Sequence, residues 1–433
     1  MRFYATILSD KVRKENAVKK PFEAFAAIPQ NPLYERLITR KNGDLYRREG
    51  DTRTPFERDY TRILHSNAYR RLKHKTQVFF DPENDHICTR IEHVMHVGSV
   101  SGTIAEALGL STDLTRAIAT GHDLGHAPFG HVGERILDKL TVKYLGERFW
   151  HEGHGVYLAD RIELLEDDQG VYRNLNLTYA VRDGIVAHCG EVDQGCLTPR
   201  CDFLDPTLWT AAGEHQPATF EACAVKLADK ITYLGRDIED AVSMGILDKS
   251  KIAELNALAR EHGVPAINTT VLMHDLIADI NRESTPDTGL LLGERTCSLI
   301  NKVKEFNTTH IYRHERLQPF CRYAELVLTE LFEMLLPYHD GADTLFKLTA
   351  CAARGESPRL LTEFAAYLAP YVTCAMPDTL SAQYPQELYR NDKVYGDLSD
   401  RKDYLRAVRD YVAGMTDTFA IKMYESLLSL GNS

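Results

Sequence analysis

H-D-L-G-H-A-P-F-G-H occupies residues 122–131 and brings three histidines and an aspartate into ten positions. Neighbouring side chains on a regular helix diverge by roughly 100°. A helix that ends between Gly121 and Gly125 would let the His122 imidazole and the Asp123 carboxylate turn toward one cation. An isolated His-Asp pair is most often structural, so a metal site is predicted here only in combination with its surroundings.

Histidines are concentrated around this run. Ten of the 17 lie between residues 65 and 154. Imidazole combined with carboxylate suits a transition metal, and an open metal site takes its ligands from separate helices. Besides His122 and Asp123, the candidates are His93, His96, His126, His131, His151 and His154.

A further carboxylate is expected from a distant helix. The segment A-C-A-V-K-L-A-D-K-I-T-Y-L-G-R-D-I-E-D-A at 222–241 places Asp229, Tyr233 and Asp237 at intervals of four residues. Side chains at this spacing stack on one helix face. This segment is therefore predicted to supply the remaining ligand.

Several other charged residues are given structural or surface roles. His96 is interpreted as a packed core histidine or a group behind the ligands, and Asp240 as a solvated helix charge. His65, His74 and His86 are expected on the surface or facing phosphate.

Helical periodicity extends along most of the chain. Apolar residues recur every three or four positions over 91–108, and Gly109 is expected to end that helix. The segment 62–75 is predicted to form an amphipathic helix with a cationic face. Strand-like alternation is scarce, so the predicted fold class is all-α. Further helices are expected over 155–166, 178–188, 219–244, 268–282, 295–306, 320–336, 358–371 and 402–429, with breaks at 189–218, 283–294, 337–343 and 376–399.

Composition indicates a globular enzyme of up to about three domains. The 433 residues carry a net charge of −11, but residues 1–80 alone hold 18 Lys+Arg against 9 Asp+Glu. This uneven distribution suggests that the first fifth meets anions. No segment approaches ~18 consecutive apolar residues and no signal peptide is apparent, so a cytoplasmic protein without membrane contact is expected.

The nine cysteines form no C-x-x-C pair and are interpreted as reduced thiols. Cys189, Cys196 and Cys201 follow His188 in one loop and form a weak candidate for a zinc site. Their spacing matches no common zinc motif.

Several ordered blocks resemble one family. R-I-E-H at 90–93, the run at 122–131 and A-D-K-I-T-Y-L-G-R-D at 228–237 look like the HD-domain dNTP triphosphohydrolases. R-I-L-H-S-N-A-Y-R-R-L-K-H-K-T-Q-V-F at 62–79 is similar to the bacterial dGTP triphosphohydrolase-like proteins. Further blocks at 174–188 and 410–417 extend the resemblance over most of the chain.

The resemblance implies a division of the chain and a metal site. It implies a basic N-terminal arm over 1–56, an HD-domain catalytic core over 57–250, and a C-terminal helical region over 251–433. The last region would complete the nucleotide pocket and supply an oligomer interface. The matching metal ligands are His93, His122, Asp123 and Asp229, which would hold one divalent ion per active site, Mn²⁺, Mg²⁺ or another transition metal.

The resemblance also implies catalytic residues. His151 matches the histidine that protonates the leaving 5′-oxygen, and His126 and Glu134 match residues that position or activate water and support that histidine. Some relatives carry Asp where this chain has Glu134, which leaves the reach of the carboxylate open. His154 and Gly155 stand where relatives often show Gln and Ser, a change that affects substrate discrimination or reflects packing.

The remaining matches are substrate contacts. They comprise residues expected beside the sugar, against the phosphates or at the 3′-hydroxyl, and a tyrosine under the deoxyribose that would exclude a 2′-hydroxyl. The residues are Gln77, Val78, Arg90, Lys230, Tyr233, Asp237, Lys304 and Tyr312, of which Lys304 is the weaker match.

The implied activity is hydrolysis of a dNTP, with dGTP favoured, to a deoxynucleoside and inorganic triphosphate. A dNTP effector and an even-numbered homo-oligomer, tetramer or hexamer, are also implied. Two alternatives stay open: an HD phosphohydrolase acting on another nucleotide, and a nucleotide-sensing or single-stranded nucleic-acid-binding HD protein that uses the basic helix.

Overall fold

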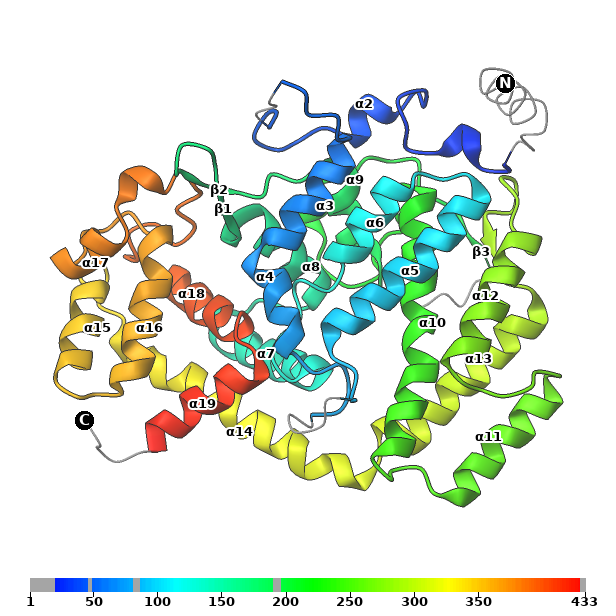
Figure 1. Ribbon diagram of the computed structural model, residues 1–433. Coiled ribbons are helices and arrows are strands. Elements are labelled where there is room, and N and C mark those ends of the chain that lie inside the picture. The colour runs from blue at the N-terminus through cyan, green and yellow to red at the C-terminus, as the bar shows by residue number, and fades with distance from the viewer. Residues whose placement is uncertain (1–19, 46–48, 81–85, 190–195, 429–433) are drawn as a thin grey trace, which may run out of the picture.

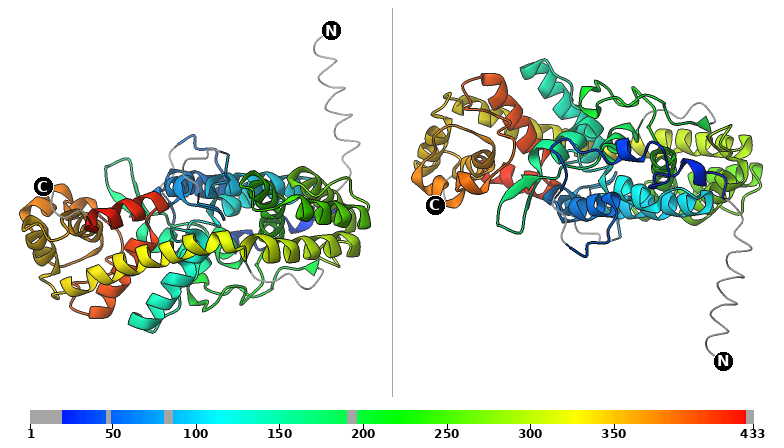
Figure 2. Two further views of the ribbon diagram at one scale, coloured as in Figure 1. Left: turned by 90° about the horizontal axis from the view of Figure 1, so that it is seen from below. Right: turned by 90° about the horizontal axis from the view of Figure 1, so that it is seen from above.

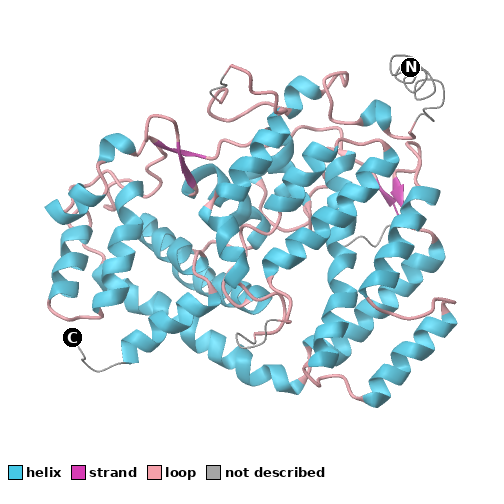
Figure 3. Cartoon of the chain, in the orientation of Figure 1, coloured by secondary structure: helices cyan, strands magenta, loops and turns pink. Residues whose placement is uncertain are grey.

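The computed structural model describes residues 20–45, 49–80, 86–189 and 196–428. Helices dominate these residues, as Figure 3 shows, and confirm the all-α fold class. The α-helices are α2 (Tyr34–Leu37), α3 (Pro55–His65), α4 (Asn67–Arg71), α5 (Arg90–Leu108), α6 (Thr112–Gly121), α7 (Gly130–Leu145), α8 (His151–Tyr157), α9 (Tyr179–Ala187), α10 (Phe220–Ser243), α11 (Lys249–Glu261), α12 (Thr269–Glu283), α13 (Glu294–Asn307), α14 (Gln318–Leu335), α15 (Thr344–Ala353), α16 (Pro358–Leu368), α17 (Asp378–Gln383), α18 (Arg401–Ala413) and α19 (Asp417–Leu428).

Shorter elements connect these helices. Two antiparallel strand pairs are present, β1 (Leu164–Glu166) with β2 (Tyr172–Asn174) and β3 (Cys196–Leu197) with β4 (Leu290–Leu291). The π-helical turns are η3 (Leu158–Ile162) and η5 (Thr308–Tyr312). The 3-10 turns are η1 (Glu23–Phe25), η2 (Leu72–His74), η4 (Pro206–Leu208), η6 (Glu315–Leu317), η7 (Leu336–Tyr338), η8 (Ala369–Tyr371) and η9 (Gln386–Leu388).

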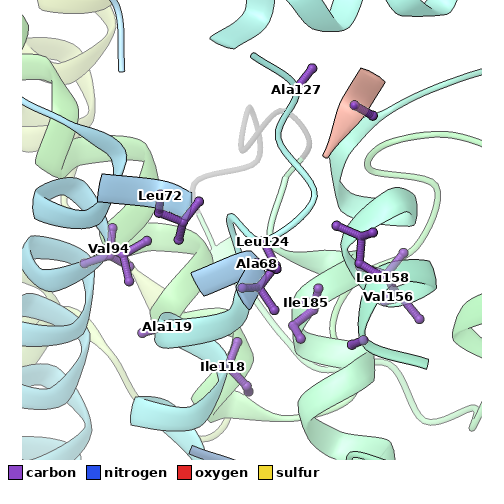
Figure 4. Packing of buried hydrophobic residues seen from close by; sticks show 14 of the residues in the cluster. Ala68, Leu72, Val94, Ile118, Ala119, Leu124, Ala127, Val156, Leu158 and Ile185 are labelled. Atoms are coloured by element: carbon purple, nitrogen blue, oxygen red, sulfur yellow. The ribbon is translucent and has the colours of Figure 1, made fainter. Parts of the chain in front are cut away.

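Helix α5 lies at the centre of the fold, packed against α6 and α10. Thr89 and Glu92 form a capping box at its start, and Gly109 ends it with a φ of 85°, a left-handed conformation that glycine adopts at no steric cost. The expected end of this helix at Gly109 is therefore confirmed. Its apolar face is buried, and Figure 4 shows Val94 among core residues from α4, α6 and α9.

The described part of the N-terminal segment lies against this core. The Phe22 ring is buried and meets the Phe220 ring edge to face at 4.8 Å. The backbone N–H of Ala27 donates to the buried carboxylate of Glu221 at 2.8 Å. The part of the chain around Phe22 and Ala27 therefore packs against α10. The domain boundaries at 56 and 250 stay predictions.

Several helix predictions are wrong in detail. The helix expected over 402–429 is two helices, α18 and α19, because the chain turns at Gly414 before Asp417 begins the second. The helix expected over 155–166 starts earlier, as α8, and passes through the π-helical turn η3 into strand β1. Helices α2, α7, α11 and α15 were not anticipated, and the predicted break at 376–399 contains α17. The single helix expected over 62–75 is interrupted, because Ser66 is extended between α3 and α4 and the segment ends in the turn η2.

Figure 1 shows α15 and α16 at one end of the molecule and α11, α12 and α13 at the other, with α14 running along one side between them. Views from above and below show the same lengthwise arrangement (Figure 2). Helix α14 packs against α7, α18 and α19. None of the helices in the described residues combines the length and apolarity needed to cross a membrane.

Candidate metal centre and active site

The sequence-predicted metal ligands converge from three parts of the fold. His93 lies one turn into α5, Asp229 lies in the middle of α10, and His122 and Asp123 follow the end of α6. The α6 helix ends at Gly121, as the run at 122–131 predicted. Because α5 packs against both α6 and α10, the three segments meet in the core.

The distances between these side chains suit a shared cation. His93 Nε2 lies 2.9 Å from Asp229 Oδ1, and His122 Nε2 lies 3.7 Å from the same oxygen. Asp123 Oδ1 lies 3.5 Å from His122 Nε2, and Asp123 Oδ2 lies 4.0 Å from His93 Nε2. Ligands at about 2.1 Å from one ion are separated by roughly 3 to 4 Å. The ligand atoms of His93, His122 and Asp229 lie within 4.8 Å of one another and suit one ion, and the Asp123 carboxylate adjoins this group.

The tautomer of His122 supports the same conclusion. Its Nδ1 donates to the Ala119 carbonyl at 2.8 Å, and this contact leaves the lone pair on Nε2. Nε2 is buried and makes no hydrogen bond within the described residues. Metal-binding histidines are oriented in this way, with one nitrogen held by a carbonyl and the other presented to the ion. The donor atoms of the cluster therefore fit a divalent metal.

Neighbouring cationic and hydrogen-bonding groups stabilise the negative charges of the Asp123 and Asp229 carboxylates. Burial opposes ionisation of Asp123, but His126, His122 and Arg90 hold the pKa of this carboxyl well below its usual range. Burial likewise opposes ionisation of Asp229, yet a hydrogen bond from His93 lowers its pKa. Both carboxylates are thus negative at neutral pH and available to a cation.

A second group of side chains lies beside this cluster. The rings of His126 and His151 are stacked with centroids 3.7 Å apart. Glu134 Oε1 accepts hydrogen bonds at 2.9 Å from both Nδ1 and the backbone N–H of His151. The longer Glu side chain therefore reaches the histidine, which answers the question raised by its replacement of Asp. His131 Nδ1 contacts the other oxygen of Glu134 at 3.0 Å.

The two stacked histidines have different protonation preferences. Burial, with the charges of Arg90 and His151, lowers the pKa of His126 well below its usual value. Burial also acts to lower the pKa of His151, but Glu152 and Glu134 outweigh it and raise that pKa to about 9. Neutral pH therefore pairs an imidazole at His126 with an imidazolium at His151.

The absence of a side chain at Gly125 lets the run at 122–131 approach α8 closely. A Cβ at this position would lie 1.9 Å from the His151 carbonyl oxygen and 2.3 Å from the Gly155 nitrogen. His154 is buried and its Nδ1 donates to the Gly125 carbonyl at 2.9 Å. Within the described residues, His154 and Gly155 therefore pack against the backbone of Gly125. This contact supports the packing interpretation of the two residues.

Two of the predicted substrate residues, Arg90 and Gln77, carry buried polar side-chain atoms. Arg90 is almost fully buried and donates from Nη1 to Asp123 Oδ2 at 2.9 Å. Its Nε and Nη2 atoms, and Oε1 of Gln77, are buried without a hydrogen-bond partner within the described residues. Val78, next to Gln77, is half-buried against the core. Such unpartnered polar atoms indicate a place for a polar ligand.

The predicted sugar contacts also meet. The hydroxyl of Tyr312, in the turn η5, donates to Asp237 Oδ2 at 2.6 Å. Tyr233 stands one turn before Asp237 on the same face of α10, and burial, followed by Asp237 and Tyr233, raises the pKa of Tyr312. Lys230 from α10 and Lys304 from α13 line one small cavity of about 30 Å³. Lys304 and Tyr312 thus come from the consecutive elements α13 and η5, which both pack against α10.

Some interpretations of single residues need correction, while others agree with the structure. Asp240 is not a solvated charge: it is 5 % exposed and accepts the backbone N–H of Cys88 at 3.0 Å. The reason is that the loop before α5 covers this part of α10. His65, His74 and His86 are exposed, in agreement with the surface interpretation. His96 is half-buried behind the ligands.

Two residues near the cluster, His188 and Glu152, were not assigned to it from the sequence, whereas His131 was among the candidates. The ring of His188 lies 4.9 Å from that of His122. A ring nitrogen of His188 lies within 4.8 Å of a ring nitrogen of His122 and a carboxylate oxygen of Asp123. Glu152 and His131 both contact the His151–Glu134 pair. The clustering of histidines signalled His131, whereas the packing of α9 against α6 and α8 brings His188 into reach of His122 and His151.

Within the described residues, Cys189, Cys196 and Cys201 do not form the zinc site considered for their loop. Cys196 and Cys201 are exposed, and neither belongs to a group of potential metal ligands within the described residues. Cys189 instead lies beside His151 and His188. Residues 190–195 between them lie outside the described residues.

Comparisons with known proteins agree with this geometry. The HD domain family matches residues 90–234, and the phosphohydrolase-associated domain matches residues 350–426. A deoxyguanosinetriphosphate triphosphohydrolase-like protein of Caldanaerobacter subterraneus subsp. tengcongensis is 31 % identical over 379 residues, which cover 87 % of this chain and 86 % of that protein.

Two further relatives carry the same name. The protein of Rickettsia bellii is 31 % identical over 415 residues, covering 94 % of this chain and 98 % of that protein. The protein of Bordetella pertussis is 29 % identical over 390 residues, covering 88 % and 91 %. With its helical core, its His/Asp cluster and these matches, the chain belongs to the HD-domain phosphohydrolases, among the deoxyguanosinetriphosphate triphosphohydrolase-like proteins.

Proposed function

We propose that the protein hydrolyses deoxynucleoside triphosphates, dGTP above all, to the deoxynucleoside and inorganic triphosphate. The observation that carries this proposal is the position of Arg90, whose unpartnered guanidinium atoms lie directly beside the His/Asp cluster. A divalent ion and the buried Arg90, both beside Asp123, would offer two positively charged groups to a phosphate chain. The names of the relatives supply the substrate class.

The cation site would be formed by His93, His122, Asp123 and Asp229. When bound there, a divalent ion supplies Lewis-acid stabilisation of the phosphate charge and favours ionisation of water. Arg90 holds a phosphate oxygen through Nε and Nη2, while its Nη1 stays bonded to Asp123.

Proton transfer is assigned to the stacked histidines. Water attacks the α-phosphorus and the bond to the 5′-oxygen breaks. His126 holds its Nε2 3.0 Å from Asp123 Oδ1, which leaves Nδ1 to accept a proton from water. His151 donates the proton on Nε2 to the leaving 5′-oxygen, because Glu134 binds Nδ1 and fixes the ring.

Selection of the sugar is assigned to the tyrosine and aspartate pair. Tyr312 packs beneath the deoxyribose, where a 2′-hydroxyl would collide, and Asp237 meets the 3′-hydroxyl. Tyr233, Gln77 and Val78 flank the nucleoside, and Lys230 and Lys304 face the outer phosphates. A dNTP effector, a tetramer or hexamer, and single-stranded nucleic-acid binding by the basic helix stay predictions.

A substrate panel tests the proposed reaction. Purified protein is incubated with each dNTP alone and in pairs, with Mn²⁺, Mg²⁺ or Co²⁺, and the products are identified by phosphorus NMR. We expect tripolyphosphate and a deoxynucleoside, most rapidly from dGTP, and a loss of at least about a hundredfold in Asp229→Asn. Release of pyrophosphate or orthophosphate from every dNTP, with no tripolyphosphate, would refute the proposed reaction.

A further inference from the structure

A cysteine lies beside the histidine to which we assign the proton donation. Cys189 follows α9, is partly exposed, and places its Sγ 3.7 Å from His151 Nε2. His188 precedes it, and the ligand atoms of His151, His188 and Cys189 all lie within 4.8 Å of one another. This set shares no residue with the four proposed ligands of the catalytic ion, but the two sites adjoin, because the ligand nitrogen of His188 also lies within 4.8 Å of ligand atoms of His122 and Asp123.

Both imidazoles present Nε2 to the thiol side. His151 Nδ1 is held by Glu134 at 2.9 Å, and His188 Nδ1 donates to the Ile185 carbonyl at 2.6 Å. Metal-binding histidines are oriented by such contacts, which fix the ring and leave the other nitrogen for the ion. The two histidines are therefore arranged as ligands before any ion binds.

The separations suit a small soft cation. Zinc binds imidazole nitrogen at about 2.0 Å and thiolate sulfur at about 2.3 Å with tetrahedral angles, which places the two atoms roughly 3.6 Å apart. The observed 3.7 Å between Cys189 Sγ and His151 Nε2 agrees with this value.

Charge balance favours a divalent ion here. Glu152 is 1 % exposed, its Oε2 lies 3.3 Å from His151 Nδ1, and its carboxylate also acts on the Cys189 thiol. Burial, followed by Glu152, raises the pKa of Cys189 well above its usual value, so the group stays a thiol without a cation. A bound ion would replace the thiol proton and the His151 Nε2 proton, and thiolate plus carboxylate would neutralise its two charges.

We propose that His151, His188 and Cys189 form a second site for a thiophilic divalent ion such as Zn²⁺, and that its occupancy stops hydrolysis. The inhibition rests on the proposed function, because the ion takes the nitrogen of His151 that would protonate the leaving group. Soft thiolate ligands select Zn²⁺ or Cd²⁺ over Mg²⁺ and Mn²⁺, so the site discriminates against the ions expected to support hydrolysis.

Cadmium tests the site without reference to activity. Full-length protein supplied with Mn²⁺ is titrated with Cd²⁺, and the thiolate-to-cadmium absorption band is recorded for the wild type, Cys189→Ser and the matched Cys196→Ser. Cys196 is exposed and belongs to the same loop. We expect the first cadmium equivalent to give a band in the wild type and Cys196→Ser, and no such band in Cys189→Ser.

Zinc inhibition of dGTP hydrolysis tests the consequence. Cys189→Ser should retain the Mn²⁺-supported rate and require a Zn²⁺ concentration roughly tenfold or more higher for half-inhibition, since loss of a ligand weakens metal binding at least as much as loss of a supporting contact. An unchanged cadmium band in Cys189→Ser would refute the site. Equal zinc inhibition in all three proteins would refute the inhibitory role and indicate exchange of the catalytic ion. A wild type without hydrolysis would refute the proposed function, while the cadmium band would still decide the site.

Discussion

At the scale of single residues, Asp237 accepts a hydrogen bond at a buried position that disfavours the ionised carboxylate. Burial raises its pKa to about 7, although the Tyr312 hydroxyl donates to it. The folded state therefore keeps a proton that the unfolded state has released once the pH exceeds about 4. The free energy of unfolding should fall as pH rises from about 4 to 7, and this contribution should then level off. Asp237→Asn should remove it, so the variant gains at least about 1 kcal/mol relative to the wild type between pH 4 and 8.

Urea unfolding at a series of pH values measures this difference. Asp202→Asn is the matched control, because Asp202 is exposed and its replacement should leave the pH dependence of the wild type unchanged. A constant difference between Asp237→Asn and the wild type across the range would contradict the prediction.

At the scale of elements, the close contact between α8 and the loop that follows α6 fixes the stacked histidines. Gly125→Ala would place a methyl group on the His151 carbonyl and push the loop away. Forcing extra atoms into such a contact typically costs about 1 to 3 kcal/mol. We expect a loss of stability in this range, measured by urea unfolding. Hydrolysis should fall roughly a hundredfold, because a 1 Å displacement of catalytic groups has that effect.

Gly102→Ala provides the comparison. Gly102 lies inside α5, and a Cβ there would have no atom within 4 Å. Alanine at this position should raise stability by up to about 1 kcal/mol and leave hydrolysis unchanged, since helix propensity is the property that changes. If both variants behaved alike, steric contact at Gly125 would not explain its role.

At the scale of the whole molecule, one carboxylate connects the C-terminal region to the site. Asp417 begins α19 and is almost fully buried. Its two oxygens each accept a backbone N–H at 2.8 Å, one from Thr76 and one from Phe129. Thr76 precedes Gln77, and Phe129 ends the loop that carries His122, Asp123 and His126. Asp417→Ala would leave two buried N–H groups unpaired and should cost about 3 kcal/mol or more, with a parallel loss of activity.

Thermal and urea unfolding with activity assays check this prediction. Asp417→Asn keeps one acceptor oxygen and should give an intermediate loss. Asp400→Ala removes an exposed cap from α18, where Asp400 accepts the Lys402 N–H at 2.8 Å, and should cost about 1 kcal/mol without affecting hydrolysis. Equal losses for Asp417→Ala and Asp400→Ala would show that Asp417 does not support the site.

Helical periodicity in the sequence predicted the all-α class, and the spacing of Asp229, Tyr233 and Asp237 predicted that these side chains share one helix face. The clustering of histidines supplied His93 and His122 among several candidates, and the family resemblance selected the four proposed cation ligands. The sequence did not predict the buried position of Asp240 or the approach of His188 and Cys189 to His151. Those contacts depend on how α8, α9 and α10 pack against one another, and packing over more than 30 residues of separation leaves no periodic signal. The turn at Gly414 was missed because both flanking helices continue the same apolar pattern.

The late position of Asp417 in the sequence also determines when the site can be completed during translation. A growing chain that has passed residue 229 contains every side chain proposed for the catalytic ion, but the carboxylate that holds the loops around Thr76 and Phe129 is translated nearly 190 residues later. Domains fold from the N-terminus as they are made. The backbone N–H groups of Thr76 and Phe129 therefore lack this acceptor until Asp417 has been made, and we expect the site to be completed only when α19 docks.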